Sequence, residues 1–219
     1  MLINWWYHEA MPTRSGHTAT EFALVAGHPA LDFVNTADRD GDRLVDERLG
    51  SFDALMRWVA GAAVAEPEVV ERLRRRGATD AGMASAALAR AHETRALIQR
   101  AFRASLDGAA DPAAVADLDR ALQRALARRH LADAGGSLRW HWEPAERELV
   151  EILGPLLLGA AELLTRPGEV ALLRVCAGPA CGWLYLDRSR NGLRRWCEMR
   201  TCGSREKSRR QYARRRAGR

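Results

Sequence analysis

The sequence predicts a mainly α protein that ends in a small module organised by four cysteines. Apolar residues recur every three or four positions through most of the chain up to residue 167, a spacing typical of the buried face of a helix. Proline or a capping residue begins several of these stretches. All four cysteines follow residue 170, where the helical pattern has stopped. The predicted fold is therefore a helical N-terminal domain with minor β structure, followed by a small C-terminal module with a short β hairpin and a basic helix. Residues 183–187 are the predicted strand of that module.

Each helix is placed by its start signal and its apolar positions. Pro29 suits the first position of a helix, because proline has no N–H to leave unpaired there. Ser51 is a good N-cap for the next helix. The expected helices run from Pro29 to about Ala37, from Ser51 to about Val64, from Pro67 to about Gly77, from Ala81 to Leu106, from Pro112, and from about Ala145 to Leu164. Before the last of these, Leu138 to Glu143 alternates with period two and predicts a short strand.

Net charge changes sign where the cysteines begin. From Val170 to the C-terminus there are 14 Lys and Arg residues against 3 acidic residues, a net charge of +11. The 169 residues before them carry 20 basic and 25 acidic residues, a net charge of −5. Only the C-terminal fifth is thus suited to a polyanion. We expect a flexible tail over residues 1–20, a helical domain with its own core over 21–169, and a basic module over 170–219.

No segment of the sequence indicates a membrane or a secreted protein. No apolar run approaches the roughly 20 residues that span a bilayer. Residues 1–20 lack the basic start, apolar middle and small-residue cleavage site of a secretory signal. The sequence therefore predicts a cytoplasmic protein without a membrane partner, in a compartment that keeps thiols reduced.

The four cysteines have the spacing of a closed zinc site. Fifteen residues separate two close pairs, and the pairs are Cys176 with Cys181 and Cys197 with Cys202. Two such pairs supply the four thiolates of tetrahedral zinc, and they leave no open position for a substrate. Gly182 and Gly203 follow the second cysteine of each pair and are expected to aim backbone N–H groups at the sulfurs. We predict one structural Zn²⁺; two disulfides or four unrelated buried thiols are the alternative.

A basic helix is expected after the fourth cysteine, with Ser204 as its N-cap. Positive charge surrounds it on all sides, which suits a polyanion, although charge runs are also common on solvated faces. Trp183, Tyr185 and Trp196 are expected to form the small core of the module rather than stack on bases. The candidate nucleic-acid contacts are Arg194, Arg195, Arg205, Lys207, Arg209 and Arg210, with Arg188 and Arg190 as further phosphate contacts.

Two parts of the sequence resemble known domain families. The C-terminal module contains four distinctive strings: Cys-Ala-Gly-Pro-Ala-Cys-Gly-Trp (176–183), Leu-Asp-Arg-Ser-Arg-Asn (186–191), Arg-Arg-Trp-Cys-Glu-Met (194–199) and Cys-Gly-Ser-Arg-Glu-Lys (202–207). Together they resemble the CGNR zinc finger of bacteria. Residues 31–36 and 94–98 are similar to motifs of the ABATE domain. The resemblance implies a stress-induced transcription regulator whose finger binds DNA and whose N-terminal domain senses an effector. Ser204 stands where the family has the Asn of its name; both residues cap helices well, so we expect the fold to be kept.

Three classes of function follow from these patterns. The first is a DNA-binding transcription regulator whose N-terminal domain binds an effector or forms a homodimer. The second is an RNA- or ribosome-associated zinc protein, since positive charge alone does not distinguish a DNA-binding from an RNA-binding protein. The third is an N-terminal enzyme tethered by the finger, but the sequence has no phosphate loop, His-Glu-x-x-His motif or nucleophile elbow. We therefore expect no enzymatic activity. Asp32, Asn35 and Arg95 are candidates for a small-molecule effector pocket; a buried network that ties the first helix to the long one is the alternative.

Overall fold

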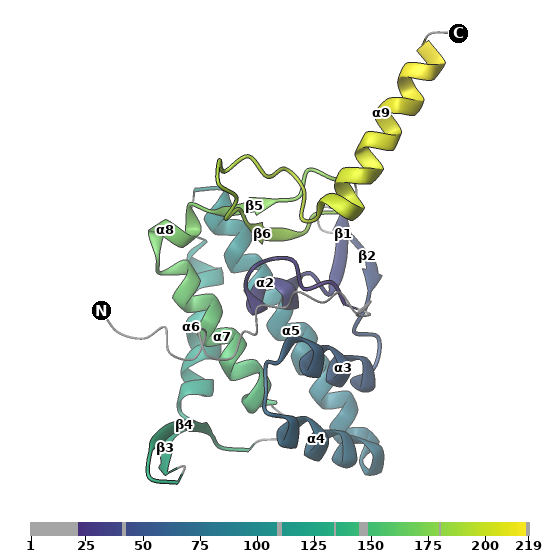
Figure 1. The fold of residues 1–219 in the computed structure, drawn as a ribbon. Coiled ribbons are helices and arrows are strands. Elements are labelled where there is room, and N and C mark those ends of the chain that lie inside the picture. Colours follow the sequence, from purple (N-terminus) through teal and green to yellow (C-terminus); the bar gives the residue numbers. More distant parts are fainter. Residues whose placement is uncertain are drawn as a thin grey trace.

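The computed structural model describes residues 22–40, 43–108, 111–133, 135–144, 149–179 and 181–217. The predicted tail over residues 1–20 lies outside them. The mainly α prediction is confirmed (Figure 1). The elements in chain order are α2 (Pro29–Val34), β1 (Ala37–Asp40), β2 (Arg43–Glu47), α3 (Phe52–Ala62), α4 (Pro67–Thr79), α5 (Ala81–Leu106), α6 (Pro112–Leu126), β3 (Arg129–Asp133), β4 (Leu138–Trp142), α7 (Val150–Leu164), α8 (Pro167–Val170), β5 (Leu173–Val175), β6 (Leu184–Leu186), a π-helical turn (Met199–Gly203) and α9 (Ser204–Ala217).

The predicted start signals are the ones the helices use. Ser51 Oγ accepts a hydrogen bond from the Ala54 N–H at 3.1 Å and caps α3. Proline occupies the first turn of α2, α4 and α6. The cap of α2 adds a residue that the sequence did not reveal: His28 Nδ1 accepts from the Ala30 N–H at 3.2 Å. Burial, followed by the charges of Arg188 and Arg166, lowers the pKa of His28 to about 4, which keeps this ring neutral and able to accept.

Strands account for the differences from the sequence prediction. Ala37 belongs to β1 rather than to the first helix, because Asn35 already ends α2. Three antiparallel two-stranded hairpins form in the described residues, β1–β2, β3–β4 and β5–β6. The sequence predicted the strand β4 and a hairpin in the C-terminal module, with a strand at β6. The strands β1 and β2 carry mostly charged residues, so they lack the alternating apolar pattern by which a strand is recognised. Helix α7 begins at Val150, and residues 145–148 of the predicted helix lie outside the described part.

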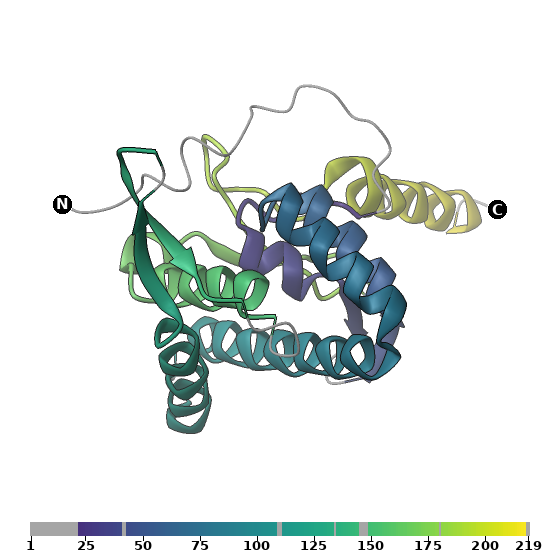
Figure 2. The ribbon, with the colours of Figure 1, turned by 90° about the horizontal axis from the view of Figure 1, so that it is seen from below.

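The short helix α2 lies at the centre of the molecule, where it contacts α5, α7 and β6 (Figures 1 and 2). Its residues Ala30 to Val34 are all buried. The largest core side chains around it include Phe33, whose ring lies 5.1 Å from that of Trp58 on α3. Because α2 is covered on several sides by different elements, it connects the helical part to the C-terminal hairpin.

The hydrophobic core is continuous across residue 170. Leu173, Trp183, Leu184, Tyr185 and Leu186 are buried in the same cluster as the side chains of the helices. The separate helical core that we expected from the sequence is therefore not what the structure shows, and the boundary at residue 170 stays a prediction. Among the described helices, none has the length and apolar character needed to cross a bilayer.

Candidate metal centre and nucleic-acid interface

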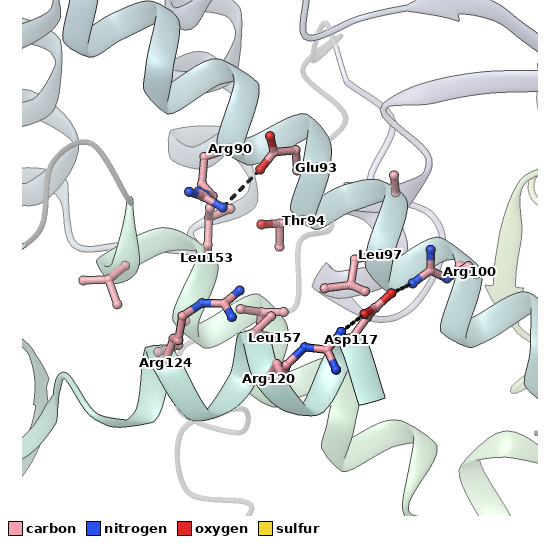
Figure 3. A pocket seen from close by; sticks show the side chains of 15 residues that line it. Arg90, Glu93, Thr94, Leu97, Arg100, Asp117, Arg120, Arg124, Leu153 and Leu157 are labelled. Carbon is pink, nitrogen blue, oxygen red and sulfur yellow. Dashed lines mark hydrogen bonds and ion pairs between the residues drawn. The ribbon is translucent and has the colours of Figure 1, made fainter. Parts of the chain in front are cut away.

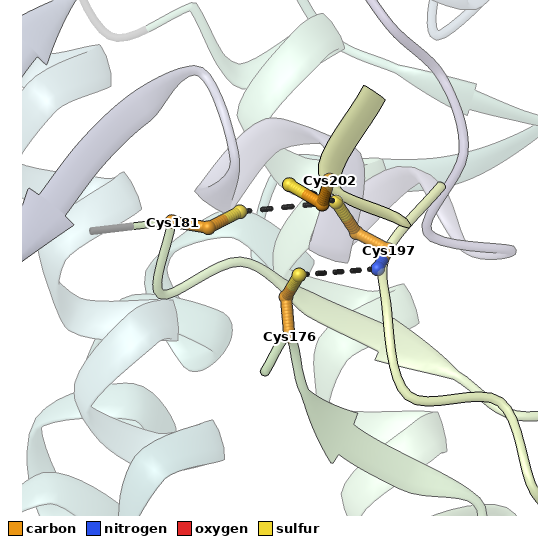
Figure 4. A group of neighbouring side chains, drawn as sticks. All are labelled: Cys176, Cys181, Cys197 and Cys202. Carbon is orange, nitrogen blue, oxygen red and sulfur yellow. Dashed lines mark hydrogen bonds between the residues drawn. The ribbon is translucent and has the colours of Figure 1, made fainter. Parts of the chain in front are cut away.

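The four cysteines converge at the end of the C-terminal hairpin (Figure 4). Cys176 directly follows β5 and Cys181 precedes β6, while Cys202 lies in the π-helical turn. Their four sulfur atoms lie within 4.8 Å of one another. The Sγ–Sγ distances are 3.8 Å from Cys181 to Cys197 and 3.7 Å from Cys197 to Cys202. A tetrahedral site with Zn–S of ~2.3 Å needs sulfurs ~3.8 Å apart, so the cluster fits one structural Zn²⁺.

The alternatives to zinc do not fit this geometry. All four cysteines are free thiols, and the measured separations are far beyond the ~2.05 Å of a disulfide bond. They are not unrelated buried thiols either, because they meet at a single point. With four cysteine ligands and Cys176, Cys197 and Cys202 buried, the site is closed, as in structural rather than catalytic zinc sites.

Backbone N–H groups support the Cys176 sulfur. The Cys197 N–H donates to Cys176 Sγ at 3.2 Å and the Gly178 N–H donates at 3.4 Å. Hydrogen bonds from the Cys181 and Cys197 thiols, with these two N–H groups, lower the pKa of Cys176 to about 2, which favours the thiolate that a metal binds. The turn at Gly182 brings the following N–H, that of Trp183, to the Cys181 sulfur, as we expected. At the second glycine the outcome differs. Gly203 N–H donates to the Glu198 carbonyl instead.

Gly182 and Gly203 differ in backbone conformation and in the space around them. Gly182 has a φ of +61°, so it does supply the sharp turn after Cys181. A Cβ at Gly203 would lie 2.5 Å from Met199 Sδ, so a larger residue there displaces the exposed Met199 side chain. Gly178, which the sequence did not single out, is the most confined of the three by the metal site: a Cβ there would lie 3.0 Å from Cys202 Sγ and 3.3 Å from Cys176 Sγ.

Replacing Gly178 by Ala is expected to weaken zinc binding about 10–100-fold, the range typical of changes in the groups that surround metal ligands. The added methyl group would press on two sulfurs that the metal holds in place. Competition with a chromogenic chelator measures the affinity. Gly168→Ala is the matched control, because a Cβ at Gly168 meets nothing within 4 Å. Equal zinc affinity of the two variants would contradict the close packing at Gly178.

Side chains of the helical part hold the finger in place. Asn35 pairs with the backbone of Leu184 in both directions: its Nδ2 donates to the Leu184 carbonyl at 2.8 Å and its Oδ1 accepts from the Leu184 N–H at 2.9 Å. The Leu186 N–H donates to the Ala26 carbonyl at 2.9 Å. Trp183 Nε1 donates to Asp38 Oδ1 at 2.6 Å. The finger is thus fixed to α2 and its flanking segments by hydrogen bonds as well as by apolar packing.

The three residues proposed for an effector pocket each have a hydrogen-bond partner in the structure. Asp32 Oδ1 accepts from the Ala26 N–H at 2.9 Å, and burial raises the pKa of this carboxyl to about 7. Asn35 is occupied by Leu184. Arg95 Nη1 donates to Thr36 Oγ1 at 2.9 Å and to Glu47 at 2.7 Å. Each side chain is buried and hydrogen-bonded to a partner of its own, as the alternative of a structural network requires, and its role in effector binding stays a prediction.

The candidate nucleic-acid residues divide into two groups. Arg194 points inward, where its Nε donates to the Trp196 carbonyl at 2.9 Å and its guanidinium lies 4.5 Å from the Tyr185 ring centre. It also donates to the Val25 and Cys197 carbonyls. The structure therefore gives Arg194 a structural role, while its contact with a phosphate stays a prediction. Exposed side chains are Arg188, Arg190, Arg195, Arg205, Lys207, Arg209 and Arg210.

Some of the exposed basic residues form ion pairs and others do not. Arg209 and Arg210 both contact Glu206, the one buried residue among positions 204–216, at 2.7 and 2.8 Å. Arg188 pairs with Glu169 at 2.5 Å. By contrast, Arg205 and Lys207 make no ion pair within the described ranges. The exposed cations of the finger that make no ion pair with a described residue thus include Arg190, Arg195, Arg205, Lys207 and the arginines at the outer end of α9.

Helix α9 projects away from the body (Figures 1 and 2). It continues directly from the π-helical turn that contains Cys202. Ser204 is already helical and its Oγ donates to the Met199 carbonyl at 3.1 Å, so it does not act as the N-cap that we expected.

The role of Asp187 was not evident from the sequence. This residue accepts hydrogen bonds from the Ser189 and Arg194 N–H groups and orders the loop before Cys197. Its place directly after a strand, with Ser189 two residues later, was the available signal for such a turn.

Comparison with protein families agrees with this architecture. Residues 27–167 match the ABATE model, described as "Putative stress-induced transcription regulator". Residues 173–215 match the model of the CGNR zinc finger. Both are regulator or zinc finger families rather than enzyme families. A comparison with curated proteins gave no match. Since the first model covers more than half of the sequence and the second covers the four-cysteine module, the chain belongs to the ABATE family and carries a CGNR zinc finger with one structural Zn²⁺ site.

Proposed function

We propose that this regulator binds DNA through helix α9 and that its helical N-terminal part receives a signal, either by binding an effector or by forming a homodimer. The observation that carries the proposal is the helix itself: 14 residues that leave the body directly from the zinc site and expose basic side chains on all sides. A helix without an apolar face gains nothing from core packing. A polyanion is the partner that stabilises it.

The dimensions of α9 suit a DNA groove. At ~1.5 Å per residue the helix is roughly 21 Å long, and its diameter of ~10–12 Å is close to the ~12 Å width of the major groove. Zinc and the π-helical turn fix its first turn, so Arg205 is the basic side chain of the helix with the firmest support. We assign base contact to Arg205 and phosphate contact to Lys207 and to Arg214, Arg215 and Arg216, with Arg195 on the adjacent loop.

Arg209 and Arg210 contribute less to this interface than their charge suggests. Both already share the Glu206 carboxylate, and these arginines hold the pKa of Glu206 below its usual value. Phosphate contact by either arginine competes with this pair. The outer arginines 214–216 have no acidic residue within a helical turn in the sequence, so they offer their full charge.

Salt dependence tests the proposal. With about five phosphate contacts, log K for duplex DNA is expected to fall with log salt at a slope of roughly −4 to −5, since each contact contributes ~0.9. Changing Arg214, Arg215 and Arg216 together to Gln should flatten the slope by about 2.7 and weaken all sequences alike. Fluorescence anisotropy with the zinc-loaded chain measures both quantities.

Matched controls make the result specific. Changing Arg75 and Arg139 to Gln removes exposed arginines of α4 and β4, outside the finger, and should leave the slope unchanged. Arg205→Ala should cost ~1–3 kcal/mol at one position of a selected DNA site and spare non-specific binding. Binding that keeps its slope after the triple substitution would contradict the proposal. An RNA competitor that displaces DNA at equal or lower concentration would favour an RNA-associated protein instead.

A further inference from the structure

A groove with arginine-rich walls lies between helices α5, α6 and α7 (Figure 3). Its volume is about 550 Å³, within the ~300–1,000 Å³ typical of small-molecule sites. The floor is apolar and is formed mainly by Leu97 of α5 with Val150, Leu153 and Leu157 of α7. The structure thus combines an apolar surface with a ring of charged groups in one concavity.

The charged groups of the groove leave an excess of positive charge. Four arginines and two acidic residues line the groove. The arginines are Arg90, Arg100, Arg120 and Arg124, and the acidic residues are Glu93 and Asp117. Arg90 pairs with Glu93 at 3.1 Å, while Arg100 and Arg120 share Asp117. Arg124 has no hydrogen-bond or ion-pair partner in the part of the chain that the structure describes. This excess stands out because the 169 residues before the finger carry a net charge of −5.

A second group in the groove also lacks a partner. Thr94 of α5 is only 6% exposed and lines the groove. Its hydroxyl makes no hydrogen bond to any described residue, although Thr165 on α7 and Thr79 on α4 each donate to a carbonyl of their own helix. The Thr94 oxygen is not one of the fully enclosed unpaired side-chain atoms of the described residues, so the hydroxyl faces the groove, where water or a bound ligand can accept its hydrogen bond. In Figure 3, Thr94 and Arg124 approach the leucines of the floor from opposite walls.

We propose that this groove binds a small organic carboxylate with an apolar body. The carboxylate accepts hydrogen bonds from the Arg124 guanidinium and the Thr94 hydroxyl, and the apolar part lies on Leu97, Leu153 and Leu157. A planar guanidinium matches the two oxygens of a carboxylate, and the charged pair strengthens both hydrogen bonds. This ligand would act as the effector of the regulator; that role rests on the proposed function, whereas the binding itself does not.

Binding is tested on the full zinc-loaded chain without DNA, so its outcome is independent of the DNA proposal. Octanoate is the probe, 1-octanol is the neutral probe of equal length, and acetate is the carboxylate without an apolar body. Isothermal titration calorimetry should show octanoate binding saturably and more than about tenfold tighter than either control, because each control lacks one half of the recognition. Equal affinity for octanoate and octanol, or no saturable binding of octanoate, would overturn the proposal.

Two substitutions locate the site. Arg124→Gln should weaken octanoate about tenfold or more and leave octanol unchanged, since the charged hydrogen bond is lost and the apolar floor is kept. Thr94→Val removes the hydroxyl at nearly constant volume and should weaken octanoate by a smaller factor. Arg139→Gln, on β4 outside the groove, is the matched control and should bind like the unchanged protein. Octanoate affinity that is unaffected by both groove substitutions would place the ligand elsewhere and refute the assignment.

Discussion

Loss of zinc is expected to destabilise the whole protein and not only its C-terminal module. Structural zinc contributes ~10–16 kcal/mol of apparent binding free energy in small finger peptides, which exceeds or matches the ~5–15 kcal/mol that stabilises a typical domain. The zinc site fixes the ends of β5 and β6, and the buried side chains of β6 belong to the core that surrounds α2. Unfolding of the finger would therefore expose the side of α2 that β6 covers.

Chelation and the substitution Cys197→Ser test this coupling. Cys197 is only 2% exposed and its sulfur lies between those of Cys181 and Cys202. Both treatments should lower the thermal midpoint, and hydrogen exchange should increase in α2 and in the part of α5 beside it as well as beyond residue 173. Added zinc should reverse chelation and should not rescue the variant. If the amides of α2 kept their protection while those of the finger lost it, the two parts would be independent folding units.

The sequence contains the local features of this fold but not its long-range contacts. Ser51 and the prolines at the first turns are local signals, because a cap or a fixed φ acts within a few residues. The cysteine spacing is equally direct, since the metal requires four thiolates and the chain offers only four. These features predicted the helices and the zinc ligands correctly.

The roles of Asn35 and Arg194 could not be read in the same way. Asn35 and its partner Leu184 are 149 positions apart, and Arg194 contacts the Val25 carbonyl across 169 positions. A polar residue in an apolar stretch indicates a buried hydrogen bond, but the pattern does not name the partner. An arginine in a basic segment resembles its exposed neighbours until the fold places carbonyls around it. The groove of Arg124 and Thr94 was missed for the same reason, because it forms only where three helices meet.

Asn35→Ala is expected to be among the most destabilising single substitutions in the helical part. The side chain is 3% exposed and Leu184 is fully buried, so the Leu184 N–H and carbonyl would both remain without water or another partner. An unpaired buried group costs ~1–3 kcal/mol, which gives a total of ~2–6 kcal/mol for the two. Urea unfolding of the zinc-loaded protein measures the free energy. Asn191→Ala, at an exposed asparagine of the finger, should change it by less than ~0.5 kcal/mol.

Asn35→Asp separates the two hydrogen bonds. The aspartate keeps an acceptor for the Leu184 N–H, but when ionised it places a second oxygen against the Leu184 carbonyl, whereas the protonated form can donate to it. Burial and this repulsion raise the folded-state pKa above the ordinary Asp value of ~3.9, so the folded state binds more protons than the unfolded state. Stability of the variant, relative to the unchanged protein, should therefore fall as pH rises from ~4 through the raised pKa and then level off. A pH-independent difference between Asn35→Asp and the unchanged protein would show that the Asn35 Nδ2 donor does not support β6, and the attachment of the finger would then depend on its other hydrogen bonds and on apolar packing.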